Sequence, residues 1–150
     1  MRRRSPRLEL DFQVATRCRD LPSREDCLAW ASAALEHDCR VALRIVGMPE
    51  GRALNRDFRA RDYATNVLTF VYAGPPVFEG DLALCAPVVK REARLQGLDA
   101  TAHWAHLVVH GMLHLQGYDH EDQGDAERME RREAQILGEL GYPDPYRMAA

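Results

Sequence analysis

Residues 101–120 of this 150-residue chain read TAHWAHLVVHGMLHLQGYDH and contain five of its six histidines. Apolar and helix-favouring side chains predict a helix from Thr101 to Leu115. Gly117 follows His114 by three residues, where the end of a helix favours a residue that adopts a left-handed conformation. We therefore expect the helix to stop at this glycine and the chain to reverse direction.

The spacing of three of these histidines is that of a metal site. His110 and His114 are four residues apart, so they lie one turn apart on the same face of the predicted helix. The reversal at Gly117 allows His120 to return as a third ligand. Three neutral imidazoles with one open position favour a single zinc ion, and three protein ligands plus water are typical of a catalytic site.

The alternative is that these residues are scattered core or surface histidines, but three at this preset spacing would arise by chance in only ~1% of comparable chains. His106 and His103 lie one and two turns before His110, respectively. We expect them to pack in the core or to support the ligands rather than to bind metal. His37 has no partner in the sequence and is expected at the surface.

Position 111 separates this site from a known class of proteases. The same histidine spacing with a glutamate after the first histidine defines the metzincins, in which the glutamate is the general base. Here that position is Gly111, which has no proton acceptor, and neither Asp119 nor Glu121 stands where the motif puts its base. A peptidase of that type is therefore not expected.

The rest of the chain alternates strand and helix signals, outward from the histidine segment. The expected strands are residues 8–14, 41–46, 67–72 and 81–85. The expected helices are residues 23–37, 52–58, 87–96, 101–115 and 125–140. We predict an α+β (α/β-like) fold, with a mixed sheet of four strands packed against five helices and the metal site on a helix–turn segment. A length of 150 residues without an internal linker favours one domain over residues 1–150.

Composition excludes one mode of nucleic-acid binding and indicates the cellular compartment. The net charge of −3 excludes a histone-like mode of nucleic-acid binding, although 13 of the 20 basic side chains lie in residues 1–62. The four cysteines form no CxxC motif and are expected to be buried and reduced. The basic N-terminus lacks the apolar stretch of a signal peptide, because Arg7, Glu9 and Asp11 follow at once. No apolar run reaches the ~20 residues of a membrane span, so we expect a soluble cytoplasmic protein.

Several blocks of the sequence resemble one family. Residues 106–120 (HLVVHGMLHLQGYDH) are similar to the signature of the bacterial YbeY family of zinc-dependent endoribonucleases of ribosomal RNA maturation. Agreement extends to residues 54–62 (LNRDFRARD), 65–70 (TNVLTF), 80–82 (GDL) and 140–146 (LGYPDPY). The chain departs from the family pattern at Ala64, Thr69 and Val71, which affects local turn geometry and not the metal site.

This resemblance implies a function and a set of site residues. It implies cleavage of single-stranded RNA, processing of the 3′ end of small-subunit (16S) ribosomal RNA, and ribosome quality control. By the same resemblance His110, His114 and His120 bind zinc, and His114 is also catalytically important. Arg59 is implied to face the substrate, and Thr65 and Asn66 to shape its groove. The implied partners are the small ribosomal subunit and ribosome-assembly proteins.

Chemistry adds roles to some of these residues. Arg59 is placed to neutralise charge that builds on the phosphate in the transition state, although its position in the sequence alone would favour a solvated arginine at a helix end. Arg56 and Arg61 are candidate contacts to the RNA backbone. Whether water or the 2′-hydroxyl attacks is left open, and a 2′,3′-cyclic phosphate product would indicate the hydroxyl. Without a basic surface, we expect weak, salt-sensitive affinity for bulk RNA.

Two other functions remain open from the sequence. One is a zinc hydrolase with a peptide or a small phosphoester as its substrate, against whose peptide version Gly111 argues. The other is a non-catalytic, ribosome-associated protein with a structural zinc ion. A closed site with four ligands would support the second function, and Asp119 is the only candidate for the fourth ligand.

Overall fold

The computed structural model describes residues 4–147; residues 1–3, at the basic N-terminus, and residues 148–150 lie outside the described part. It contains the four strands and five helices that the sequence predicted. In chain order they are β1 (Leu8–Ala15), α1 (Arg24–Ala33), β2 (Asp38–Val46), α2 (Met48–Arg59), β3 (Val67–Ala73), β4 (Val77–Cys85), α3 (Ala86–Gln96), α4 (Ala100–Leu115) and α5 (Gln123–Glu139).

The four strands form one mixed sheet in the order β1-β2-β4-β3. β1 runs parallel to β2, and β2 runs parallel to β4. β3 joins β4 in an antiparallel pair and forms one edge of the sheet. The predicted α+β class with a mixed sheet is therefore confirmed.

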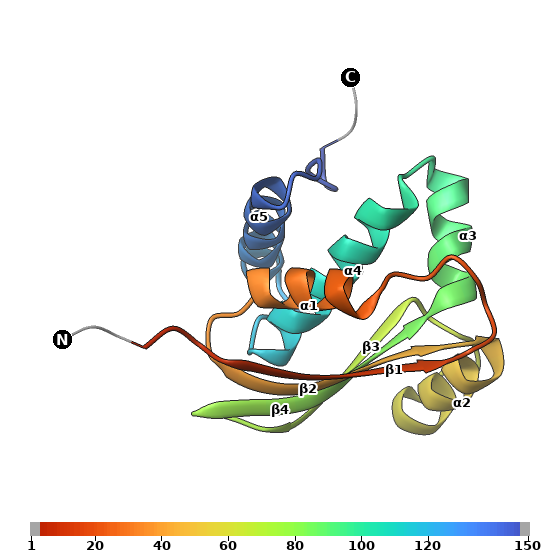
Figure 1. The fold of residues 1–150 in the computed structure, drawn as a ribbon, viewed down its shortest axis with the longest axis horizontal. Coiled ribbons are helices and arrows are strands. Elements are labelled where there is room, and N and C mark those ends of the chain that lie inside the picture. The colour runs from red at the N-terminus through yellow and green to blue at the C-terminus, as the bar shows by residue number, and fades with distance from the viewer. Residues whose placement is uncertain (1–3, 148–150) are drawn as a thin grey trace.

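The helices are divided unequally between the two faces of the sheet. α1, α3, α4 and α5 cover one face, called here the inner face, and α2 lies against the other, the outer face (Figure 1). The inner face carries fully buried aliphatic side chains, among them Leu43, Ile45, Leu82 and Leu84. α4 supplies the largest part of the core that covers them, including Trp104 and Met112.

A glycine allows α4 to approach the sheet closely. A β-carbon at Gly111 would lie 2.9 Å from Cδ2 of Leu82 in β4, so the leucine side chain would have to shift. The position at which metzincin proteases carry a glutamate is therefore turned into the core of this protein, away from solvent. Close packing against Leu82 therefore explains why position 111 is a glycine, in addition to its lack of a proton acceptor.

Several predicted boundaries were wrong by a few residues. α1 ends at Ala33 rather than at 37, because the chain turns there to begin β2 at Asp38. β2 and β4 both begin earlier than predicted, because their parallel pairing starts at Asp38 and Val77. Polar side chains on the outer face interrupt the apolar pattern there, so the sequence did not reveal these strand starts. α2 begins at Met48, four residues before the predicted start.

Two further expectations concern cysteines and a histidine. All four cysteines are free, as predicted, but Cys18 is only half-buried whereas the other three are buried. His37 is exposed, as predicted, and its ring lies beside that of Phe78 with 5.2 Å between ring centroids. Among residues 4–147, no helix has the length and apolar character needed to cross a membrane.

Candidate metal centre

The end of α4 has the geometry that its sequence predicted. Gly117 has a φ of +104°, which side chains rarely adopt. The amide of Tyr118 donates to the carbonyl of Leu113 at 3.0 Å, and that of Gly117 donates to the carbonyl of His114 at 3.1 Å. These two bonds form a Schellman motif, which ends the helix and reverses the chain. The reversal returns His120 to the helix face that carries His110 and His114.

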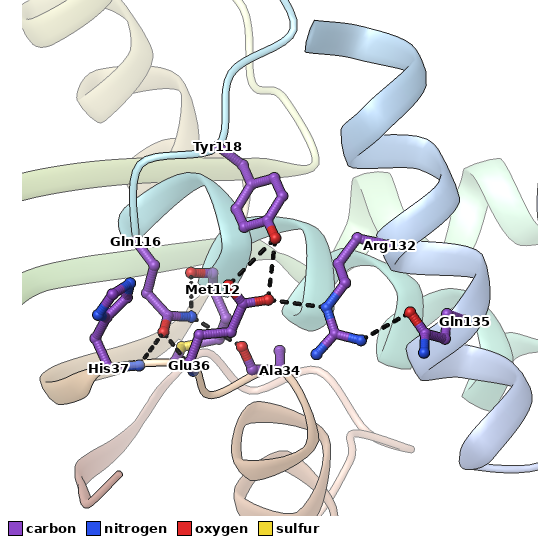
Figure 2. Close-up of polar contacts among 8 residues, drawn as sticks. All are labelled: Ala34, Glu36, His37, Met112, Gln116, Tyr118, Arg132 and Gln135. Atoms are coloured by element: carbon purple, nitrogen blue, oxygen red, sulfur yellow. Dashed lines mark hydrogen bonds and ion pairs between the residues drawn. The ribbon is translucent and has the colours of Figure 1, made fainter. Parts of the chain in front are cut away.

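A network of polar contacts holds this turn against the rest of the molecule (Figure 2). The side chain of Gln116, only 5% exposed, donates to the carbonyl of Ala34 and accepts from the amides of Glu36 and His37. The Glu36 carboxylate in turn accepts hydrogen bonds from Tyr118 and from Arg132 of α5. Two other segments of the chain, residues 34–37 and α5, therefore hold the loop that leads to His120.

The structure brings the three predicted histidines together. The ring centroid of His120 lies 5.7 Å from that of His110 and 5.8 Å from that of His114. With zinc–nitrogen bonds of about 2.0–2.1 Å in a tetrahedral site, the centroids of two imidazole ligands lie roughly 5 Å apart. The observed spacing is slightly wider than that.

Hydrogen bonds orient two of the three rings. Nδ1 of His110 lies 2.9 Å from Oε1 of Glu133, and Nδ1 of His114 lies 3.0 Å from the backbone carbonyl oxygen of Tyr118. Both acceptors require a proton on Nδ1, which leaves Nε2 with a free lone pair. Burial lowers the pKa of His114, an effect that outweighs its bond to Tyr118, and so favours the neutral form that binds metal.

The chemistry of these donors fits a zinc ion, but the side chains as they stand do not form a finished site. Among residues 4–147, no group of three or more histidine, cysteine, aspartate or glutamate side chains is arranged to hold a metal ion. His120 is exposed and, within the described residues, its ring makes no hydrogen bond, so it is the side chain free to reorient. Asp119, the candidate fourth ligand, accepts a hydrogen bond from the amide of His120 at 2.7 Å.

Sequence analysis missed Glu133, a carboxylate on α5 that is 1% exposed. It contacts His110 at 2.9 Å and His106 at 3.2 Å, and it accepts a hydrogen bond from the Tyr146 hydroxyl at 2.8 Å. Burial alone would raise its pKa, but the hydrogen bonds with His106 and His110 outweigh burial and lower the pKa of Glu133 to about 2. The signal in the sequence is its place on the apolar stripe of α5, which otherwise carries Met129, Ile136 and Leu137.

His103 and His106, which were expected to pack or to support the ligands, have different surroundings. His106 shares Glu133 with His110. His103 contacts a second carboxylate, Glu92, at 3.0 Å through Nε2, and its buried Nδ1 atom has no partner within the described residues. Asn66 donates to the same Glu92 carboxylate at 3.1 Å.

The predicted arginines lie at the C-terminal end of α2. Arg59 donates to the backbone carbonyl of Thr69 in β3 at 2.7 Å, and in residues 4–147 no hydrogen bond or ion pair joins it to the three histidines. Its connection to them is through the sheet, because α4 packs against β3 and β4. Arg56 pairs with Asp57, and Arg61 donates to the hydroxyl of Tyr63; both arginines are exposed.

Taken together, the fold and the cluster describe an α+β protein that gathers three imidazoles at the end of a buried helix, the donor set of metal-dependent hydrolases. A family model described as Endoribonuclease YbeY matches residues 17–141. This chain belongs to that family.

Individual relatives agree along nearly the whole length. A protein of Methylibium petroleiphilum named Endoribonuclease YbeY is 55% identical over 140 residues, covering 93% of this chain and 93% of the relative. One of Thiobacillus denitrificans with the same name is 54% identical over 144 residues, covering 95% and 98%. The solution structure of a Thermotoga maritima protein is similar in fold, with a TM-score of 0.57, 24% identity, and coverage of 93% of this chain and 99% of that one.

Proposed function

We propose that this protein is a single-strand-specific, zinc-dependent endoribonuclease that processes ribosomal RNA, including the 3′ end of 16S ribosomal RNA, and acts in ribosome quality control. Membership of the YbeY family, whose curated relatives are named endoribonucleases, supports the reaction class. The observation that carries the proposal is the pair of Nδ1 hydrogen bonds at His110 and His114, which leave the Nε2 atom of each ring free to bind a metal ion.

In this proposal His110, His114 and His120 hold one zinc ion, and His120 completes the set by reorienting its ring. When bound, the ion would supply Lewis acidity and lower the pKa of water or of a ribose hydroxyl. The protein's own contribution is to keep the imidazoles neutral and correctly oriented. Burial of His114 and its bond to the carbonyl of Tyr118 serve this purpose.

Arg59 is proposed to neutralise charge that develops on the scissile phosphate. Its guanidinium lies on edge strand β3 and, within residues 4–147, makes no ion pair with a carboxylate, so its charge is available to a phosphate. Arg56 and Arg61 are proposed to contact the RNA backbone, which requires Arg56 to exchange its exposed pair with Asp57. Thr65 and Asn66, which lie just before β3, are proposed to shape the substrate groove.

The proposal also covers the domain organisation, the compartment and the partners. We propose that residues 1–150 form one YbeY-like domain, that the protein acts in the cytoplasm, and that its partners are single-stranded RNA, the small ribosomal subunit and ribosome-assembly proteins. Because the chain has a net charge of −3, we propose that specificity depends on a partner that presents the RNA to Arg59.

Metal analysis combined with cleavage of single-stranded RNA tests the proposal. The zinc-loaded wild type is compared with His114→Ala and Arg59→Ala, using His37→Ala and the exposed Arg94→Ala as matched controls. We expect His114→Ala to lose zinc and activity, and Arg59→Ala to keep zinc while the cleavage rate falls by about 10²–10³. A zinc-loaded wild type that cuts no RNA would refute the nuclease assignment, and equal zinc content in His114→Ala would refute the ligand assignment.

A further inference from the structure

A hollow lies between α2 and the outer face of the sheet, on the side opposite the histidine cluster. Its volume is about 330 Å³, within the range of roughly 300–1,000 Å³ that small-molecule sites occupy. Leu54 and Phe58 of α2 form one wall, and Phe70 and Tyr72 of β3 form the other. Ala83 of β4 contributes a small side chain beneath them, which leaves the space open. We call this hollow the α2 groove.

The groove exposes aromatic rings that nothing in the described chain covers. Phe58 is 66% exposed and Tyr72 is 67% exposed. Phe58 and Phe70 meet edge to face, with ring centroids 5.3 Å apart. Large apolar rings exposed next to each other favour a flat aromatic ligand that stacks on them.

Arg59 does not line the groove but places a positive charge next to Phe70 in its wall. Its guanidinium lies over the Phe70 ring, 5.8 Å from the centroid, and donates to the carbonyl of Thr69. The neighbouring Arg52 is neutralised by Asp62 in a two-pronged ion pair. Within residues 4–147 Arg59 has no such acidic partner, so an anion is its complement.

Polar side chains also line the groove, where they are bonded to one another. Arg44 donates to Glu50 at 2.6 and 3.0 Å and to Gln13 at 2.9 Å. A planar aromatic ring with polar edges that is joined to a phosphate is a nucleotide. The exposed rings and the unpaired charge of Arg59 therefore favour a base of single-stranded nucleic acid over an apolar peptide, which would leave Arg59 without an anion.

The groove and the histidine cluster lie on opposite faces of the sheet, with β3 and β4 between them. Gly80 of β4 packs closely against both β3 and α4. A β-carbon at Gly80 would lie 2.2 Å from the carbonyl oxygen of Phe70 and 2.8 Å from Cδ1 of Leu115 in α4. The residue that follows His114 therefore packs on one face of the sheet where the groove opens on the other. A single strand that passes over the edge strand β3 can contact both.

We propose that the α2 groove binds one base of single-stranded RNA, stacked on Phe58 beside Phe70, with an adjoining phosphate on Arg59. This inference rests on the proposed ribonuclease function and adds to it a base subsite outside the metal centre. It makes Phe58 a binding residue for the substrate, and the phosphate next to the stacked base is the one that Arg59 contacts.

Binding of a fluorescently labelled, short 2′-O-methyl oligoribonucleotide to the zinc-loaded full chain tests the subsite, with strand integrity checked on a gel. Phe58→Ala is compared with Phe58→Trp and with Leu95→Ala, which removes an equally exposed apolar side chain (79% exposed) from α3. Stacking contributes about 1–3 kcal/mol per base, so Phe58→Ala should raise Kd by roughly 5- to 150-fold. Leu95→Ala should leave Kd unchanged.

Two further measurements separate stacking from other effects. An oligonucleotide of the same length that lacks its bases should bind wild type and Phe58→Ala equally, because only phosphates remain. Phe58→Trp should keep the affinity of the wild type, and its new indole fluorescence should be quenched by RNA, since the two native tryptophans, Trp30 and Trp104, are each only 3% exposed. Because Phe58 is largely exposed, Phe58→Ala should unfold at the same denaturant concentration as the wild type.

Other results would overturn the proposal. Equal affinity of Phe58→Ala and wild type for the base-containing strand would do so, as would an equal loss of affinity for both strands. A wild-type dimer in sedimentation that Phe58→Ala converts to monomer, with unchanged Kd for RNA, would show the groove to be an interface between copies. If wild type cuts RNA and Phe58→Ala behaves like wild type, only the subsite fails; if wild type binds RNA but never cuts it, the proposed function fails.

Discussion

Glu133 lies 2.9 Å from Nδ1 of His110, and this contact joins α5 to the histidine cluster on α4. The carboxylate is fully buried and also contacts His106 and Tyr146. A carboxylate in this position fixes the tautomer and orientation of an imidazole ligand and makes it a stronger donor. The packing of α5 against α4 is therefore part of the metal centre as well as of the core.

Replacing Glu133 by glutamine should weaken zinc binding about 10- to 100-fold, the usual effect of losing such a partner. Glutamine keeps the shape but lacks the negative charge that holds the proton on Nδ1 of His110. Competition with a zinc chelator measures the affinity, and Glu139→Gln, an exposed change on the same helix, is the control. Unchanged zinc affinity in Glu133→Gln would contradict the orienting role.

Gln116→Ala should lower the free energy of unfolding by about 2–4 kcal/mol, because buried partners that lose a hydrogen bond cost about 1–3 kcal/mol each. The lost contacts are those to Ala34, Met112, Glu36 and His37. Urea unfolding measures the change. Gln135→Ala, which removes an exposed side chain bonded to Arg132, should change stability far less, and an equal effect of both would show that the network contributes little.

Two buried thiols should make the protein less stable in alkali. Burial and the neighbouring Asp26 raise the pKa of Cys27 from 9.0 to about 12, and burial with Asp38 raises that of Cys39 to about 11. Below pH 9 both thiols are protonated in the folded and unfolded states. Above pH 9 the unfolded chain ionises first, so this contribution to stability is progressively lost as the pH rises through the folded-state values.

Urea unfolding below pH 9 and near pH 11 measures this loss, and the Cys27→Ala/Cys39→Ala variant is the control. The loss of stability between the two conditions should be smaller in the variant than in the wild type. An identical loss in both proteins would show that other groups cause the alkaline effect.

Two glycines should respond oppositely to alanine. Gly80→Ala should destabilise by about 1–3 kcal/mol or more, because the new β-carbon would meet the backbone oxygen of Phe70. Gly138→Ala places its β-carbon in open space on α5 and should stabilise by about 0.5–1 kcal/mol through helix propensity. Thermal unfolding of both variants provides the measurement, and destabilisation by Gly138→Ala would contradict the packing at that position.

The local features of this fold could be predicted because each depends on neighbouring residues. Ser23 and Asp26 form the capping box that begins α1, and Gly97 and Gly117 have the positive φ that ends α3 and α4. The early starts of β2 and β4 could not be predicted in the same way. They depend on pairing between strands about forty residues apart, which overrides the polar residues on the outer face.

In the candidate site, too, local features could be predicted and contacts between distant segments could not. The spacing in residues 110–120 predicted by itself that three imidazoles would meet, because one helical turn and one glycine turn determine where the side chains point. Glu133, Glu36 and the α2 groove were not predicted. Each depends on contacts between residues that are distant in the sequence. A local pattern does not indicate which side chains from distant segments will meet.

The sequence by itself determined the element types, the sharp end of α4 and the histidine cluster, since short-range backbone and side-chain geometry decides all three. The tertiary structure alone decided that α5 delivers a carboxylate to His110, that position 111 faces the core, and that α2 leaves aromatic rings open on the outer face. These outcomes follow from packing between distant segments, in which burial and hydrogen bonding select one arrangement among many that the local sequence permits.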